Sequence, residues 1–209
     1  MSSLPSKEKQ RLKVLWHYDV LDSIPEEVFD DLTELAARIC EAPIALISLV
    51  DEKRQWFKSK VGVSLSETSR DISFCSHAIE QPDLFIIPDA TKDQRFAENP
   101  LVTSDPKVRF YAGAPLVGPD GHALGTLCVI DKVPRELRPE QKQALRILAR
   151  HIMTQLELRR HSHQLARAHR QRDRVQQDLE KARAEIAALR SKLKQRKPKQ
   201  PSSRGRKRK

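Results

Sequence analysis

The chain has 209 residues, enough for one sizeable core with an appendage. Its formal net charge of +11 is unevenly divided: 19 Lys and Arg face 4 Asp and Glu from residue 159 onward, and acids are in slight excess before it. No apolar stretch has the length of a membrane span or the features of a secretory signal. Only three scattered cysteines occur (Cys40, Cys75 and Cys128), which argues against a disulfide framework, and we expect a cytoplasmic protein.

Two amphipathic helices are predicted at the start of the chain. Leu12, Leu15 and Trp16 share one face of the first helix, which should end near residue 18. In the second helix, Ser23 is placed to act as the N-cap and Pro25 to stand in the first turn. The expected apolar stripe of the second helix consists of Val28, Leu32, Leu35, Ala36 and Ile39.

A buried hairpin is predicted next. The continuous apolar run APIALISLVD, residues 42–51, indicates a strand that is covered on both faces. After the short turn DEKR, the segment QWFKSKVG is the expected partner strand. Trp56 and Phe57 are adjacent on that strand, so they face opposite sides. We expect one of the two in the core and the other at the surface or in an interface.

The middle of the chain alternates short elements. In RDISFCSHAI, residues 70–79, Ser73 is expected to cap a short helix that ends near residue 80. The segment LFIIPD predicts a strand, followed by a long polar loop. VRFYAGAPLV and ALGTLCVID are predicted strands, joined by GPDGH, which is a strong hairpin turn signal. This order of helices and strands is an α+β pattern.

From about Arg138 the pattern is helical, and its first part should face the core through Leu145, Leu148, Ile152 and Leu156. Nine of the twelve heptad seam positions between 158 and 196 are apolar, which predicts a coiled coil. We expect it to join two copies of the chain in a parallel homodimer. The predicted parts are a body over residues 1–158, the coiled coil over 159–196 and a disordered basic tail over 197–209.

Three stretches resemble a bacterial GAF domain: YDVLDSIPEEVFDDLTELAARIC, PIALISLVDEKRQWFKSKVG and FYAGAPLVGPDGHALGTLCVIDKVPREL. The resemblance implies an antiparallel sheet with helices on one face, which often form the dimer surface, and a small-molecule pocket on the other. Such domains bias the activity of a signalling enzyme, and their ligands vary widely, so the resemblance leaves the ligand and any cofactor unknown. Because only the predicted coiled coil and tail follow this body, we expect a non-enzymatic sensor or adaptor with a separate signalling output protein.

Cys75 admits three interpretations. At the second position of its predicted helix, the thiol has the helix N-terminus to lower its pKa, which would suit redox or covalent chemistry. It could equally contact a ligand without reacting, or fill the core as a small apolar group, which we favour. His77 is two residues away and would not face it on a helix, and Cys-x-His alone lacks zinc spacing. We predict no catalytic residue and no metal, and the alternative function is a small redox enzyme or redox sensor that uses Cys75.

Other residues are candidates for the pocket that the resemblance implies. Asp89 begins the long loop and Arg109 lies beside an aromatic pair, which could together hold an anionic or planar ligand. In the alternative, Phe110 fills the core and Arg109 makes a surface ion pair. The predicted ligand-binding set is Cys75, His77, Asp89, Arg109, Phe110 and Tyr111.

The tail lacks apolar and aromatic residues and is densely basic. This composition suits contact with nucleic acid phosphates regardless of sequence, and it would also suit an anionic membrane or an acidic protein, or serve as an extension without a partner. The predicted polyanion-binding residues are Lys197, Lys199, Arg204, Arg206, Lys207, Arg208 and Lys209.

Overall fold

The structure is a computed structural model that describes residues 5–195. Its centre is a six-stranded antiparallel sheet with the strand order β3-β2-β1-β6-β5-β4. The strands are β1 (Ile44–Val50), β2 (Arg54–Val61), β3 (Glu67–Ser69), β4 (Phe85–Ile87), β5 (Phe110–Val117) and β6 (Ala123–Asp131). The predicted α+β class with an antiparallel sheet and flanking helices is confirmed.

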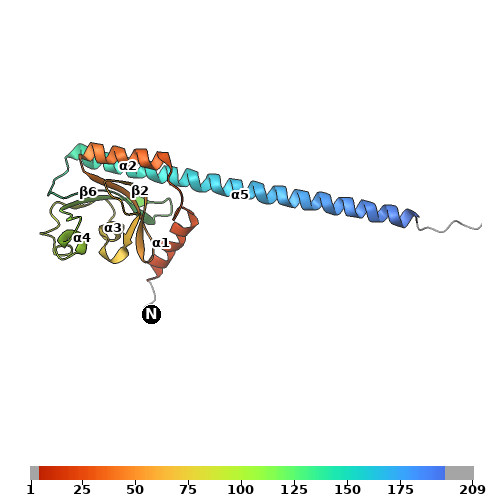
Figure 1. Ribbon diagram of the computed structural model, residues 1–209, viewed down its shortest axis with the longest axis horizontal. Helices are drawn as coiled ribbons and strands as arrows, with labels where there is room; N and C mark the ends of the chain where they lie inside the picture. Colours follow the sequence, from red (N-terminus) through yellow and green to blue (C-terminus); the bar gives the residue numbers. More distant parts are fainter. Residues whose placement is uncertain (1–4, 196–209) are drawn as a thin grey trace, which may run out of the picture. The chain divides into compact units, whose positions relative to one another are not determined.

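Helices cover both faces of this sheet. One face carries α2 and the beginning of α5, and the other carries α3 and α4 (Figure 1). The helices are α1 (Ser6–His17), α2 (Glu27–Cys40), α3 (Phe74–Ala78), α4 (Pro100–Thr103) and α5 (Pro139–Gln195), with a short 3-10 helix over Arg70–Ile72. The long C-terminal helix expected from the sequence is therefore present.

Two hydrophobic cores follow from covering the sheet on both sides. Phe110 and Trp56 lie in the core beneath α1, α2 and α5. Tyr111 and Phe57 lie in the core beneath α3 and the long loop between β4 and β5, residues 88–109. This alternation is the period of two that a strand imposes. Trp56 and Phe57 do face opposite sides, but the expectation that only one of them lies in the core is wrong, because β2 is covered on both faces and both side chains are buried.

The start of α2 differs from the prediction. The helix begins at Glu27, and the hydroxyl of Ser23 accepts a hydrogen bond from Lys58 Nζ at 2.9 Å instead of capping the helix. Val28 and Leu35 are 38% and 44% exposed, although the apolar stripe placed them toward the core. The buried face of α2 consists of Phe29, Leu32, Thr33, Ala36, Ala37 and Cys40.

The first part of α5 completes the body. Leu145, Leu148, Ile152 and Leu156 are buried, as predicted. The described residues up to 161 form one compact unit, and those from 162 to 195 belong to a second one. Within the described part of the second unit, the side chains expected at the heptad seam are exposed (Leu165, Val175, Leu179, Ile186, Leu189 and Leu193). The coiled coil stays a prediction, and the basic tail lies outside the described residues.

No helix within residues 5–195 combines the length and the apolar character needed to cross a lipid bilayer.

Candidate functional site

A buried pair of thiols lies beneath α3. Cys75 is the second residue of that helix, and its Sγ is 3.9 Å from Sγ of Cys128 on β6. The hydroxyl of Tyr111 on β5 donates a hydrogen bond to Cys75 Sγ at 3.4 Å. All three side chains are at most 2% exposed. The structure thus joins three groups that are far apart in the sequence into one cluster, the thiol cluster of Cys75, Tyr111 and Cys128.

The ring of Tyr111 reaches Cys75 by passing over Gly113. A Cβ atom added at Gly113 would come within 2.3 Å of the Tyr111 hydroxyl. The absence of a side chain at Gly113 is therefore what lets Tyr111 point at the thiols.

Small polar side chains surround the thiol cluster on the same face of the sheet. Ser48 and Ser73 both donate hydrogen bonds to Oε1 of Gln55, at 3.3 Å in the case of Ser48. Gln55 Nε2 in turn donates to Thr68 Oγ1 at 2.6 Å. The hydroxyl of Thr126 is wholly buried, and it has no hydrogen-bond partner within the described residues. Buried polar groups are costly unless they are hydrogen-bonded, and this part of the core nevertheless holds several of them.

The cluster favours a negative charge on one sulfur. Hydrogen-bond donation by Cys128 is the main cause that lowers the pKa of Cys75, to about 6, and it outweighs burial, which would raise that pKa. The hydroxyl of Tyr111, which donates to the same sulfur, acts in the same direction. The same contact with Cys75 raises the pKa of Cys128 well above its usual range. Only one of the two thiols is therefore expected to ionise near neutral pH.

Aromatic rings close the cluster off from solvent. Phe74 stacks on Phe96 with ring centroids 4.1 Å apart and on Tyr111 at 5.2 Å. Phe96 belongs to the long loop after β4, and it is also tilted against Phe85 at 6.2 Å. The protein's own side chains thus fill the space around Cys75 in this structure.

The other candidate residues lie outside the thiol cluster. His77 is exposed and meets the edge of Phe96 at 4.9 Å. Asp89 accepts hydrogen bonds from the backbone and hydroxyl of Thr91 at 3.1 and 2.7 Å. Arg109 Nη1 donates to the carbonyls of Val102 and Val108, at 2.9 and 3.0 Å, so it fastens the long loop.

Phe110 lies in the other core, beneath α2 and α5, as expected in the interpretation in which it fills the core. Of the six candidates, the structure brings Cys75 and Tyr111 into direct contact. It adds Cys128, which the sequence placed in an apolar strand without a partner. Ligand binding by these residues stays a prediction.

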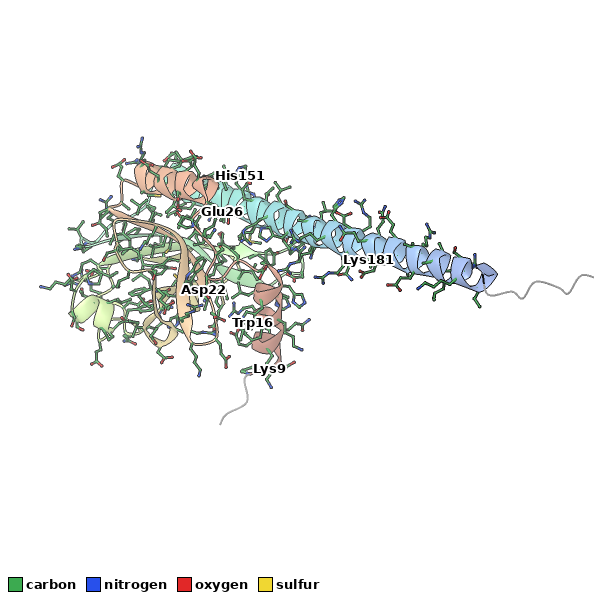
Figure 2. All side chains as sticks on the ribbon, turned by 45° about the vertical axis from the view of Figure 1, so that its right-hand side comes forward. Lys9, Trp16, Asp22, Glu26, His151 and Lys181 are labelled. Atoms are coloured by element: carbon green, nitrogen blue, oxygen red, sulfur yellow. The ribbon has the colours of Figure 1, made fainter. Side chains whose placement is uncertain are left out.

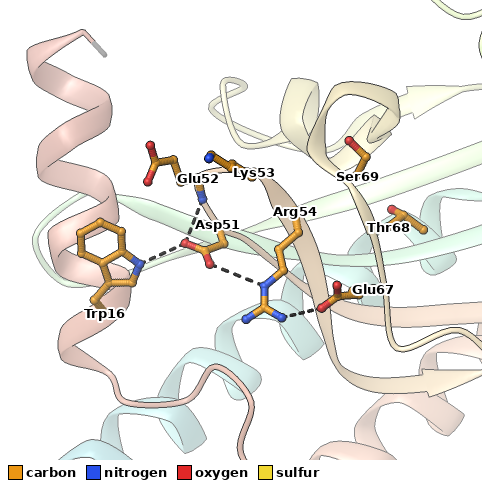
Figure 3. A pocket seen from close by; sticks show the side chains of 8 residues that line it. All are labelled: Trp16, Asp51, Glu52, Lys53, Arg54, Glu67, Thr68 and Ser69. Atoms are coloured by element: carbon orange, nitrogen blue, oxygen red, sulfur yellow. Dashed lines mark hydrogen bonds and ion pairs between the residues drawn. The ribbon is translucent and has the colours of Figure 1, made fainter. Parts of the chain in front are cut away.

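A second feature is a surface hollow beside α1 (Figure 3). The indole Nε1 of Trp16 donates to Asp51 Oδ1 at 3.0 Å, and Arg54 lies between the carboxylates of Asp51 and Glu67. Arg54 also pairs with Asp22 at 2.6 Å. The carboxylates of Asp22 and Glu67 neutralise the guanidinium and raise its pKa, so little of its charge is free for an anionic ligand. The hollow is best explained as the place where α1 packs against the turn before β2.

An ion pair connects α1 to the segment that carries Cys75. Arg70 Nη1 donates to Glu8 Oε1 at 2.6 Å and to the backbone oxygen of Asp51 at 3.0 Å. Arg11 pairs with the same carboxylate at 2.8 Å and is itself buried. Arg70 thus couples the start of α3 to the first helix.

Within the described residues, no group of three or more His, Cys, Asp or Glu side chains is arranged to hold a metal ion.

Comparison with known proteins agrees with this architecture. The family profile of the GAF domain matches residues 25–156. A cyclic di-GMP phosphodiesterase of Pseudomonas aeruginosa is 40% identical over 153 residues, which are 73% of this chain and 26% of that protein. The chain therefore spans about a quarter of the length of this relative.

Solved structures share the fold at low identity. The GAF domain of an Acinetobacter phosphoenolpyruvate-protein phosphotransferase superposes with a TM-score of 0.55 at 16% identity, covering 77% of this chain and 96% of that one. A free methionine-R-sulfoxide reductase from Neisseria meningitidis, in complex with its substrate, gives 0.53 at 15% identity, covering 78% and 97%. At such identities the likeness is one of fold. The family profile and the sheet with its flanking helices agree, and the chain belongs to the GAF domain family.

Proposed function

We propose that this protein is a non-enzymatic signal sensor or adaptor that receives a signal in its GAF body and passes it on through α5. Membership of the GAF family makes it a signalling or sensing protein. The observation that supports the proposal best is that α5 is one helix with two roles. Its first part supplies Leu145, Ile152 and Leu156 to the core, and its later part carries exposed apolar residues at heptad spacing. A change in core packing would therefore act on the same helix that meets a partner.

The proposed partner of this later part is a second copy of the chain. Leu179, Ile186 and Leu193 are 49%, 50% and 67% exposed, and they recur every seven residues. Parallel pairing of two such helices would bury this stripe and place like positions together. Arg172 occupies a seam position and should weaken pairing in the middle while it restricts the register.

We further propose that the basic residues from 197 to 209 contact nucleic acid phosphates. Seven of these thirteen residues are Lys or Arg, and none is acidic or aromatic. Such a segment supplies charge for phosphate contacts without reading bases. An anionic membrane or an acidic protein is the competing partner, and comparing retention on duplex DNA with retention on anionic vesicles separates nucleic acid from membrane.

The output would be a separate signalling protein, and we propose cyclic di-GMP signalling as its setting. Support comes from the 40% identity to a cyclic di-GMP phosphodiesterase. That relative is about four times as long as the matched segment, so its activity is assigned to it alone.

A redox sensor or small redox enzyme is the second candidate function, and the contact between Cys75 and Cys128 favours it. Of its two forms, the sensor agrees better with the site, because a thiol cluster at most 2% exposed is poorly placed to admit an organic substrate.

The dimer proposal is tested by light scattering and by site-specific cross-linking of the full chain at tens of micromolar. We expect a dimer for the wild type. Replacing Leu179 by Cys should give a covalent dimer on mild oxidation, because a parallel seam places equal positions together. The matched control is Gln177→Cys on the outer face of the same helix, which should cross-link far more slowly. A monomeric wild type, or equal cross-linking at both positions, would contradict the proposal.

A further inference from the structure

We propose that Cys75 and Cys128 are an oxidation site at which a hydroperoxide forms a reversible disulfide inside the GAF body. The two Sγ atoms are 3.9 Å apart, and a disulfide requires about 2.05 Å, so the sulfurs must approach by roughly 1.9 Å. Cys128 lies on β6, which is fixed between β1 and β5. Cys75 lies on α3, a separate helix of only five residues. Formation of the disulfide therefore requires α3 to shift, while the sheet stays in place.

The chemistry balances with the hydroperoxide as the oxidant. The Cys75 thiolate attacks the outer oxygen, an S–O bond forms and the O–O bond breaks, and the leaving oxygen takes a proton to become water or an alcohol. Cys128 then attacks the sulfur of the resulting sulfenic acid. The S–S bond forms, the S–O bond breaks and the Cys128 proton leaves with the hydroxide as water. Two electrons pass from the thiol pair to the hydroperoxide.

The surroundings assign the first step to Cys75. Tyr111 donates a hydrogen bond to its sulfur at 3.4 Å, and Cys128 is in contact with the same atom. These donors stabilise a thiolate, the reactive form. The third cysteine provides an internal comparison, because Cys40 lies in the other core and burial raises its pKa to about 11. Cys40 should therefore stay reduced.

Access to the thiols depends on the long loop that covers α3. Asn99 Nδ2 donates to the carbonyl of Ile72 at 3.0 Å, and Asn99 Oδ1 accepts from the backbone of Leu101 at 2.9 Å. Phe96 of the same loop stacks on Phe74. A hydroperoxide can reach Cys75 when this cover opens locally, so the opening should limit the rate. Asn99→Ala removes both hydrogen bonds and should accelerate oxidation, whereas Glu98→Ala, at an exposed neighbour, should not.

The consequence for signalling rests on the proposed sensory function. Arg70, five residues before Cys75, holds Glu8 of α1 at 2.6 Å. A shift of α3 toward β6 would pull on this ion pair and so reach the first helix. Disulfide formation itself is tested independently of that role, because the loss and recovery of the two thiols are measured chemically whatever the signalling output.

The experiment treats the reduced full chain with hydrogen peroxide, then unfolds it and labels the remaining thiols with an alkylating agent before mass spectrometry. We expect wild type and Cys40→Ser to lose two hydrogen atoms, to yield a Cys75–Cys128 cross-linked peptide and to regain both thiols with dithiothreitol. Cys75→Ser should stay unmodified. Cys128→Ser should instead accumulate a sulfenic acid at Cys75, captured by dimedone, because the resolving thiol is missing.

Three results would overturn the inference. These are full alkylation of both thiols after peroxide, a cross-link that includes Cys40, and a cross-link only between chains. If Cys128→Ser fails to fold by circular dichroism, the wild-type peptide map and the rate comparison of Asn99→Ala with Glu98→Ala still decide. A disulfide that forms without any change in dimerisation or output would leave the site in place and count against the sensory role.

Discussion

Lys58 and Arg159 hold the same oxygen atom of one carboxylate. Oε1 of Glu26 accepts from Lys58 Nζ at 2.7 Å and from Arg159 Nε at 2.8 Å. Lys58 has no exposed side-chain surface, and its ammonium also donates to the carbonyl of Ile24 at 2.7 Å. Arg159 donates to the carbonyl of Asp19 at 2.8 Å. The loop between α1 and α2, shown with Glu26 in Figure 2, is thereby attached to β2 and to α5.

Replacing Glu26 by Gln should therefore destabilise the body. Partial burial would raise the pKa of Glu26, but the hydrogen bonds from Lys58 and Arg159 prevail and lower it, so the carboxylate is charged at neutral pH. The substitution leaves the buried ammonium of Lys58 without a counter-charge, and since Glu26 is partly exposed we expect a loss of about 1–3 kcal/mol. Urea unfolding measures it. Glu27→Gln, at an exposed neighbour, is the control and should change stability little; an equal effect of both would contradict the shared role.

The pairing of Asp83 with Arg146 predicts a pH dependence. Hydrogen bonds from the guanidinium of Arg146, at 2.8 and 2.7 Å, and from the backbone of Leu84 lower the pKa of Asp83 to about 2. Because an unfolded Asp has a pKa of about 3.9, the pair stabilises the fold above that pH and loses its effect as the pH falls toward 2. Both side chains are substantially exposed, so the contribution should stay below about 1 kcal/mol.

An NMR titration of the Asp83 carboxyl measures this directly. Arg146→Gln should raise its pKa toward about 3.9. Arg150→Gln, one turn further along α5, is the matched control. An unchanged pKa in Arg146→Gln would show that the pair does not persist in solution.

Phe96→Ala should test how much the aromatic cover of the thiol cluster contributes. Phe96 is 1% exposed, and its ring stacks on Phe74 at 4.1 Å. Truncation removes this contact and leaves a cavity, for which about 3–5 kcal/mol is typical. Leu65→Ala, at a side chain that is 61% exposed, should stay within about 0.5 kcal/mol. Urea unfolding with both variants gives the comparison, and a small loss for Phe96→Ala would mean that the loop does not cover α3 in solution.

Deleting residues 197–209 should abolish retention of duplex DNA at low salt. The deletion removes seven basic residues and lowers the formal net charge from +11 to +4. For the full chain, each phosphate neutralised should add about −0.9 to the slope of log affinity against log salt concentration, and a dimer with two tails should steepen it further.

Fold and dimer should survive the deletion, as checked by circular dichroism and light scattering. Equal retention by full and truncated chains would assign DNA binding elsewhere. Retention on anionic vesicles but not on DNA would favour the membrane.

Much of the fold was predictable because its signals are local. The apolar run of β1, the turn between β5 and β6 and the cap at Ser73 are all read from neighbours in sequence, and Ser73 does accept a hydrogen bond from the backbone of Ser76 at 3.2 Å. The predicted cap at Ser23 was wrong because a serine hydroxyl suits either role. In the structure it accepts a hydrogen bond from Lys58, which lies 35 residues away in the sequence.

The candidate site was harder to predict because it depends on pairing across the sheet. Cys75 and Cys128 are 53 residues apart, and the residues next to either cysteine do not indicate that the other is its neighbour. The available signal was the set of small polar residues, such as Ser48 and Thr126, within otherwise apolar strands. Their shared face becomes visible only when the register of β1 against β6 places Ser48 opposite Thr126.

The position of Tyr111 above Gly113 ties the choice of one amino acid to the other. A side chain at position 113 would strike the phenol, so Gly113→Ala should be tolerated only when position 111 carries a smaller residue. Among natural or designed variants of this chain, the two positions should therefore change together. A variant library randomised at both codons and selected for folding would display that coupling as a forbidden combination, namely tyrosine at 111 with any side chain larger than hydrogen at 113.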